Sequence, residues 1–196
     1  MNFKIKNKLT VGVTGGILCG KSTALAAWKQ AGAYVISCDE VVKEISARRS
    51  VQRKIQALLG TTQREALARK VFTNTAARKQ LEQLLHPLLY TEIKRQLRSS
   101  KERIRVVEVP LLFEVGWEKN FDVTLAILAS QSLLAKRAKQ RGMTQADCVK
   151  RAHSQWSQTK KAALADICIV NDGTAADLTK KVSALYRALD TIYQVK

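Results

Sequence analysis

Residues 9–22 read LTVGVTGGILCGKS, a short run of β-favouring residues that ends in a glycine-rich turn. Gly15 to Ser22 match the spacing G-x-x-x-x-G-K-[ST], in which backbone N–H groups curl around a phosphate. Residues 21–31 carry the pattern of a helix, which Gly32 ends. The unpaired N–H groups of that helix would face the same anion. The stretch therefore predicts an α/β fold with a phosphate loop; the alternative is a glycine-rich turn that binds nothing.

The rest of the chain alternates between strand and helix patterns. Further strands are predicted at residues 34–37, 105–110, 122–128 and 166–170. Further helices are predicted at residues 131–141, 145–156, 158–165 and 175–193. Residues 39–100 contain no strand pattern and read as a helical insertion of the kind that forms a substrate-binding lobe. Together these patterns predict a five-stranded parallel sheet with helices on both faces.

Composition narrows the class of protein. The chain has 196 residues, of which 46% are hydrophobic, enough to bury a core without metal or disulfide support. With 34 Lys and Arg against 16 Asp and Glu, the net charge is +18, which attracts anions such as nucleotides, nucleic acid or acidic lipid. The chain has only two prolines and nine glycines, and these low counts exclude a collagen-like or linker-dominated chain.

The spacing of the cysteines and the sequence near the N-terminus indicate the cellular compartment. The four cysteines are Cys19, Cys38, Cys148 and Cys168. No two of them form a CxxC pair, so their spacing matches neither a zinc site nor a small disulfide scaffold. Residues 9–19 are too rich in glycine and threonine for a signal-peptide core, and no window reaches the ~18 apolar residues of a membrane span. We expect reduced thiols in a cytoplasmic protein without a membrane partner.

The loop residues have distinct expected roles. Gly15 and Gly20 allow backbone conformations that a Cβ atom would forbid. Lys21 would place a cation on the β- and γ-phosphates, and the Ser22 hydroxyl would ligate Mg²⁺. Cys19 is expected to be a small residue that fills a small space. The alternative is a candidate oxidation site, since a thiol at a helix N-terminus beside Lys21 would have a lowered pKa.

Two carboxylates follow predicted strands, and each allows two interpretations. Asp39 opens a helix after residues 34–37, either as an ordinary N-cap or as the base that takes a proton from an acceptor hydroxyl. Glu108 ends the strand RVVEV, either as a solvated carboxylate or as an outer-shell partner of Mg²⁺. Asn171 and Gly173 either shape a turn against a nucleobase or simply make the turn.

With these motifs in order, the chain resembles the dephospho-coenzyme A kinase family from about residue 9 to residue 189. The resemblance rests on the segments VGVTGGILCGKST, AYVISCDEVVKEI, RKVFTN, LEQLLHPLL, VVEVPLLFE and ADICIVNDG. Gln131, Arg137, Arg141 and Gln155 fall on the family's lid pattern. So many motifs in one order are more specific than the phosphate loop alone.

The resemblance implies a single three-layer P-loop kinase domain. Its core would comprise about residues 8–38, 104–130 and 165–196, with a helical substrate lobe at about 39–100 and a helical lid at about 131–164. The implied reaction is Mg²⁺-dependent transfer of the ATP γ-phosphoryl group to the ribose 3′-hydroxyl of dephospho-coenzyme A. This is the last step of coenzyme A synthesis.

The resemblance also implies roles for individual residues. Catalysis would rest on Lys21, Asp39 and Arg137. ATP would contact Gly15, Gly16, Ile17, Leu18, Cys19, Gly20, Lys21, Ser22, Thr23, Arg137 and Arg141. The acceptor would contact Asp39, Lys43, Arg78 and His86. The alternative for His86 is a structural role at a helix end. The alternative for the two lid arginines, Arg137 and Arg141, is that they form a solvated basic face. Ser22 would hold Mg²⁺, with Glu108 in its outer shell.

The chain departs from the family pattern at several positions. Leu18 and Cys19 replace a glycine and a serine in the loop, and Ser37-Cys38 stand where the family usually has Asp-Ala. Lys43 takes a position that is commonly Arg, and Glu108 one that is commonly Asp. The segment between residues 46 and 72 is shorter than usual.

Two other functions fit parts of the sequence. One is a small-molecule kinase of the nucleoside monophosphate type, which differs in its acceptor. The other is a nucleic-acid-binding protein with a degenerate phosphate loop, but Lys and Arg are dispersed and only 6% of residues are aromatic. We therefore expect ATP and dephospho-coenzyme A as partners, no nucleic acid, and a monomer or weak homo-oligomer.

Overall fold

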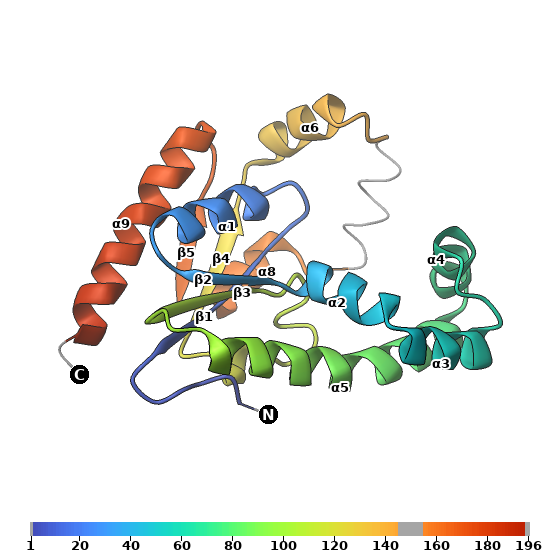
Figure 1. Ribbon diagram of the computed structural model, residues 1–196. Helices are drawn as coiled ribbons and strands as arrows, with labels where there is room; N and C mark the ends of the chain where they lie inside the picture. Colours follow the sequence, from blue (N-terminus) through green and yellow to red (C-terminus); the bar gives the residue numbers. More distant parts are fainter. Residues whose placement is uncertain (1, 145–154, 195–196) are drawn as a thin grey trace. The chain divides into compact units, whose positions relative to one another are not determined.

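The computed structural model describes residues 2–144 and 155–194 (Figure 1). The chain divides into two compact units, one of residues 37–99 and one of the chain on either side of that segment. After its first residue, the first unit consists of helices joined by short connections, and its bounds lie close to the helical insertion expected from the sequence. The second unit holds the sheet and the phosphate loop.

The sheet has five strands in the order β2-β3-β1-β4-β5. The strands are β1 (Leu9–Gly15), β2 (Tyr34–Ser37), β3 (Ile104–Glu108), β4 (Val123–Leu128) and β5 (Ile167–Val170). β1 is central and pairs in parallel with β3 and β4, so that Val13 lies beside Glu108 and Gly15 beside Ile127. All five predicted strands are confirmed to within two residues. The loop that follows the central strand therefore opens at the carboxyl edge of a parallel sheet.

Two aspartates hold the starts of neighbouring strands in register. The Thr10 N–H and hydroxyl both donate to the Asp122 carboxylate, at 2.9 and 2.7 Å. The Thr124 N–H and hydroxyl make the same pair of bonds to Asp166, both at 2.7 Å. Because each aspartate directly precedes the next strand, one carboxylate ties that strand to its neighbour at the amino edge.

Helices cover both faces of the sheet. α1 (Lys21–Gln30) and α9 (Ala175–Gln194) pack against each other over one face, as Figure 1 shows. The core on this side consists of buried apolar residues, among them Val11, Val13, Trp28, Leu178 and Val182. α8 (Gln158–Leu164) packs against β1 and β4, and its Lys161 donates to the same carbonyl, that of Pro110, as Thr14 does. Since side chains alternate along a strand, this places α8 on the face opposite Val13.

Four of the helices predicted in this unit are confirmed, at residues 21–30, 131–140, 158–164 and 175–194. α6 (Gln131–Gln140) follows β4. A short 3-10 turn, η1 (Glu118–Asn120), precedes β4. The helix predicted at residues 145–156 falls mostly outside the described residues, and its last two residues are not helical. In the part of the chain that the structure describes, no helix is long and apolar enough to cross a membrane.

The helical unit contains α2 (Cys38–Ala47), α3 (Arg49–Leu59), α4 (Arg64–Thr73) and α5 (Thr75–Ser99). α2, α3 and α4 each pack on α5, and the buried residues between them include Val41, Ile45, Ile55, Ile93 and Leu97. α5 is one helix of 25 residues that continues through Pro87. The expectation that His86 lies at a helix end is therefore wrong, because the helix accommodates the proline without stopping.

Glu92 of α5 is a buried carboxylate held by three side chains. Arg48 donates to it from α3's N-cap position at 2.9 Å, Arg95 at 2.6 Å, and Gln96 at 3.1 Å. These hydrogen bonds, with Arg95 contributing most, lower the pKa of Glu92 to about 2 from an ordinary value of 4.5. The ionised carboxylate therefore stabilises the folded unit above pH 4.5, and this contribution is lost as the pH falls from 4.5 towards 2.

We expect Glu92→Gln to lower the free energy of unfolding at pH 7 by about 1–2 kcal/mol, because exposed arginines leave the pair partly screened by water. Urea unfolding at pH 7 and at pH 2.5 measures the difference, which should be much smaller at the lower pH, close to the folded-state pKa of Glu92. Glu82→Gln, which removes the partly exposed partner of Arg78, is the control and should change little. An equal loss at both pH values would contradict the prediction.

Candidate functional site

The loop between β1 and α1 is shaped to surround an anion. Gly20 is the N-cap of α1, and the helix starts at Lys21 with its N–H groups at the loop. The Lys21 ammonium donates to the carbonyls of Gly15 and Gly16, at 3.1 and 2.9 Å. The cation therefore lies against the start of the loop, where it would meet the phosphates of a bound nucleotide.

Both fixed glycines of the motif are required by contacts as well as by backbone conformation. A Cβ atom on Gly15 would lie 2.5 Å from the Ile127 carbonyl oxygen of β4. Gly20 has a φ of 99°, and a Cβ atom there would collide with the Asn171 side-chain nitrogen. Neither position can take a side chain without moving the neighbouring backbone or a buried amide.

Leu18 is in the left-handed conformation with a φ of 63°, which costs a non-glycine residue about 1–2 kcal/mol. Its carbonyl accepts a hydrogen bond from the Arg137 guanidinium of α6 at 2.9 Å. The same guanidinium also donates to the Asn171 carbonyl at 3.2 Å. Arg137 thus joins the loop to the end of β5, and this contact supports the strained residue in its conformation.

Cys19 is buried, as expected for a residue that fills a small space, and the alternative of a lowered pKa is wrong. Burial raises the pKa of its thiol, and this effect exceeds the opposing charge of Lys21. The thiol donates to the Gln158 side-chain oxygen at 3.0 Å. Gln158 also pairs with both backbone groups of Ala129, accepting at 2.8 Å and donating at 3.2 Å. The cysteine is thus a small buried residue that packs the loop against α8.

A buried ion pair involves Lys161 of α8, the helix against which Cys19 packs the loop. This ion pair was not predicted from the sequence. Lys161 is fully buried; its ammonium donates to the Pro110 carbonyl at 2.6 Å and pairs with Glu114 at 3.0 Å. Glu114 also accepts from the Trp156 N–H at 2.8 Å. Burial lowers the pKa of Lys161, Glu114 opposes the change, and the charge of Lys21 adds to it. Lys161 looked like one of many surface lysines, although Glu114 stands in the segment VVEVPLLFE.

Two oxygen donors for a cation are present at this edge of the sheet. Ser22 is exposed in the first turn of α1, and Glu108 ends β3 in register with Val13 of β1. Glu108 is buried, so the interpretation as a solvated carboxylate is wrong. Within the described residues no cluster of three or more His, Cys, Asp or Glu could hold a metal. A hydroxyl and a carboxylate fit Mg²⁺ that takes its other ligands from phosphate and water.

The structure also describes the other residues expected to contact ATP and the two glutamines of the lid pattern. Ile17 and Thr23 are half-buried, and Arg141 is exposed at the C-cap of α6. Gln131 is the first residue of α6 and is exposed. The Gln155 side-chain oxygen is buried and has no hydrogen-bond partner among the residues that the structure describes.

The predicted acceptor residues all belong to the helical unit. Asp39 is exposed in the first turn of α2, and the N-cap is Ser37, so the interpretation of Asp39 as the cap is wrong. Lys43 is exposed one turn later, and His86 is half-buried within α5. Arg78 forms an exposed ion pair with Glu82 one turn along α5, at 2.9 Å.

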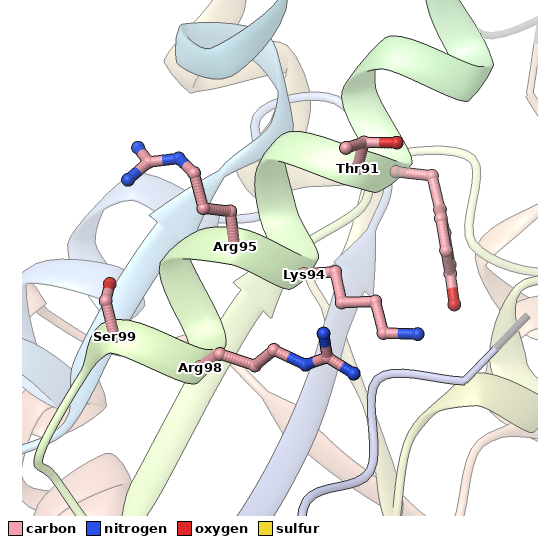
Figure 2. Close-up of a pocket in the computed structure, with 6 residues that line it drawn as sticks. Thr91, Lys94, Arg95, Arg98 and Ser99 are labelled. Atoms are coloured by element: carbon pink, nitrogen blue, oxygen red, sulfur yellow. The ribbon is translucent and has the colours of Figure 1, made fainter.

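The last turns of α5 carry a basic hollow. Figure 2 shows the Lys94 and Arg98 side chains reaching into the same space from one face of the helix, with Arg95 and Ser99 on another side. The Lys94 ammonium also lies 5.8 Å from the centre of the Tyr90 ring. None of the residues predicted to bind substrate lines this hollow. Cations at a helix C-terminus complement the helix dipole, which accounts for their positions.

Comparisons with known proteins agree with this geometry. The family model for dephospho-CoA kinase matches residues 9–177. The chain is 33% identical to the dephospho-CoA kinase of Protochlamydia amoebophila over 91% of this chain and 95% of that protein. It is 33% identical to that of Chlorobaculum tepidum over 98% of this chain and all of that protein.

Solved structures give the same result for the fold. The crystal structure of TT1252 from Thermus thermophilus has a TM-score of 0.84 at 29% identity, covering 94% of this chain and 99% of that one. Dephospho-CoA kinase from Campylobacter jejuni has a TM-score of 0.67 at 26% identity, covering 92% and 96%. Shikimate kinase from Aquifex aeolicus, at 13% identity and a TM-score of 0.52 over 93% and 99%, shares the fold of P-loop kinases.

We expect iodoacetamide at pH 7.5 to alkylate Cys19 at least about 10-fold more slowly in the folded protein than in urea, because the thiol is buried and its pKa is raised. Mass spectrometry of peptides from timed samples measures the rate. Cys168, which is exposed, is the internal control and should differ less between the two conditions. Equal rates for Cys19 in the folded and unfolded chains would contradict the burial seen here.

Proposed function

The chain belongs to the dephospho-CoA kinase family, and we propose that it transfers the γ-phosphoryl group of ATP to the ribose 3′-hydroxyl of dephospho-coenzyme A. The observation that carries this proposal is the formed phosphate loop. Lys21 is already held over the first turn of that loop, and the N-terminus of α1 opens onto it. Phosphoryl transfer needs mainly positioning and neutralisation of charge, which backbone N–H groups and cations supply.

The charge of the loop's surroundings suits a polyphosphate. Lys21 and Arg137 bring two cations to the loop, whereas the charge of Lys161 is offset by Glu114. In this proposal Lys21 neutralises charge between the β- and γ-phosphates. Arg137 would act from the lid of residues 131–164, because its guanidinium has further N–H groups for phosphate oxygens beside the two that bond the Leu18 and Asn171 carbonyls.

Asp39 is proposed as the group that orients or deprotonates the acceptor hydroxyl. It is an exposed carboxylate in the first turn of α2. A carboxylate of this kind can accept the hydroxyl proton as the oxygen attacks. Lys43, Arg78 and His86 are proposed as further acceptor contacts of the helical lobe.

Mg²⁺ is the proposed companion of ATP. Ser22 would be its protein ligand and Glu108 would accept hydrogen bonds from its bound water. When bound, the ion would neutralise charge on the β- and γ-phosphates. The buried position of Glu108 at the end of β3, in register with β1, supports this role.

We further propose a cytoplasmic enzyme that works as a monomer or weak homo-oligomer and does not use nucleic acid. Of the three cysteines in the described residues, none is in a disulfide, which suits a reducing compartment. The net charge of +18 is then an attraction for two anionic substrates.

The direct test is ADP release by the purified protein with ATP and Mg²⁺, alone and with dephospho-coenzyme A. We expect ADP only with dephospho-coenzyme A, and coenzyme A as the product by chromatography. AMP and CMP run as competing acceptors and should give none. Turnover with a monophosphate would reassign the acceptor within the same fold. Binding of RNA that weakens steeply with salt, without turnover, would favour a nucleic-acid-binding protein.

Two substitutions test the proposed residues separately. Lys21→Ala should lower kcat at least about 100-fold, because a cation at the transferred group is lost. Asp39→Asn should lower kcat about 100-fold or more with a smaller change in the KM for ATP, because the proton acceptor is lost. Lys29→Ala in the last turn of α1 and Glu40→Gln beside Asp39 are the matched controls. Normal turnover in Lys21→Ala, with the melting temperature unchanged, would contradict the proposal.

A further inference from the structure

Asn171 is placed to act on the phosphate loop from outside it. It follows β5, is 3% exposed, and its backbone N–H donates to the Leu128 carbonyl at 2.8 Å. Its side-chain amide turns towards the loop and donates to the Cys19 carbonyl at 2.8 Å. The side chain is close enough that Gly20 can only be glycine. A residue that merely made a turn after β5 would not need this contact.

The hydrogen bond to Cys19 determines how the next peptide group faces. The Cys19 carbonyl and the Gly20 N–H belong to one planar trans peptide, in which the two groups point in opposite directions. Holding the carbonyl towards Asn171 therefore aims the Gly20 N–H away from Asn171. Gly20 is the last loop residue before α1, and the N–H groups at this point of the motif cradle the phosphates.

The loop needs this support because of the residues it contains. Leu18 has a left-handed backbone, which is unfavourable for leucine, and its carbonyl is held by Arg137. The next carbonyl, that of Cys19, is held by Asn171, and Arg137 also bonds the Asn171 backbone. Two successive carbonyls are thus kept outward by side chains that come from different elements.

We propose that Asn171 is a positioning residue of the phosphate loop, which sets the affinity for the nucleotide by holding the Cys19–Gly20 peptide with its N–H turned towards the β-phosphate. The inference rests on the proposed function in one respect, that the loop's ligand is an adenine nucleotide. It assigns Asn171 to the phosphate side of the site and not to the nucleobase.

The test is calorimetric binding of ADP and of AMP to Asn171→Ala, to Asn171→Asp and to wild type. ADP carries the β-phosphate and AMP does not, so both variants should bind ADP at least about 10-fold more weakly while AMP affinity changes less than about twofold. Asn171→Asp keeps the side-chain size but replaces the N–H donor with an oxygen that faces the Cys19 carbonyl. It answers the question even where the alanine variant does not fold.

Asp172→Asn is the matched control. Its side-chain oxygen accepts the Ser130 N–H at 2.6 Å, and the asparagine keeps that acceptor, so ADP affinity should match wild type. In turnover assays the Asn171 variants should raise the KM for ATP and leave the KM for dephospho-coenzyme A unchanged. Melting temperatures without ligand separate this effect from a loss of stability.

Three other results of the binding experiment would overturn either the positioning role of Asn171 or the proposed function. ADP affinity within twofold of wild type in both variants, whatever their melting temperatures, overturns the positioning role and leaves the proposed function standing. An equal loss of ADP and AMP affinity overturns it in favour of a nucleobase contact. A wild-type protein that binds neither nucleotide overturns the proposed function itself.

Discussion

The constraint on which this structure depends is the turn that connects β1 to α1 around an anion. For the loop N–H groups to face inwards, the opposite carbonyls must face outwards into protein, and each then needs a donor. Lys21 serves Gly15 and Gly16, Arg137 serves Leu18, and Asn171 serves Cys19. Two of these donors, Arg137 and Asn171, come from elements outside the loop and hold its carbonyls.

The same requirement explains the polar residues buried beside the loop. Lys161 lies in α8 against the Pro110 carbonyl and is kept there by Glu114, whose charge offsets the burial of the ammonium. One turn before it in α8, Gln158 joins the Cys19 thiol to the end of β4. A parallel sheet with all its carboxyl ends at one edge gives these groups a common place to meet.

Local patterns were enough for the parts of the molecule that depend on neighbours in sequence. The five strands and the phosphate loop were predicted because apolar runs, glycine spacing and turn residues act over a few residues. The environment of a side chain was harder to predict. Cys19 has a raised pKa because burial outweighs Lys21, and Glu108 is buried because β3 is an interior strand. His86 is within a helix because α5 continues through Pro87.

The sequence by itself determined the fold class, the loop and its lysine, because the motif residues act through their own backbone and their immediate neighbours. It also determined the family, since several motifs occur in one order along the chain. Only the tertiary structure decided which distant side chains support the loop. Asn171 lies 152 residues from Cys19 and Arg137 lies 119 residues from Leu18, and no local pattern encodes contacts over such separations. They arise because β4 and β5 end at the same edge of the sheet as β1, which depends on strand order and register.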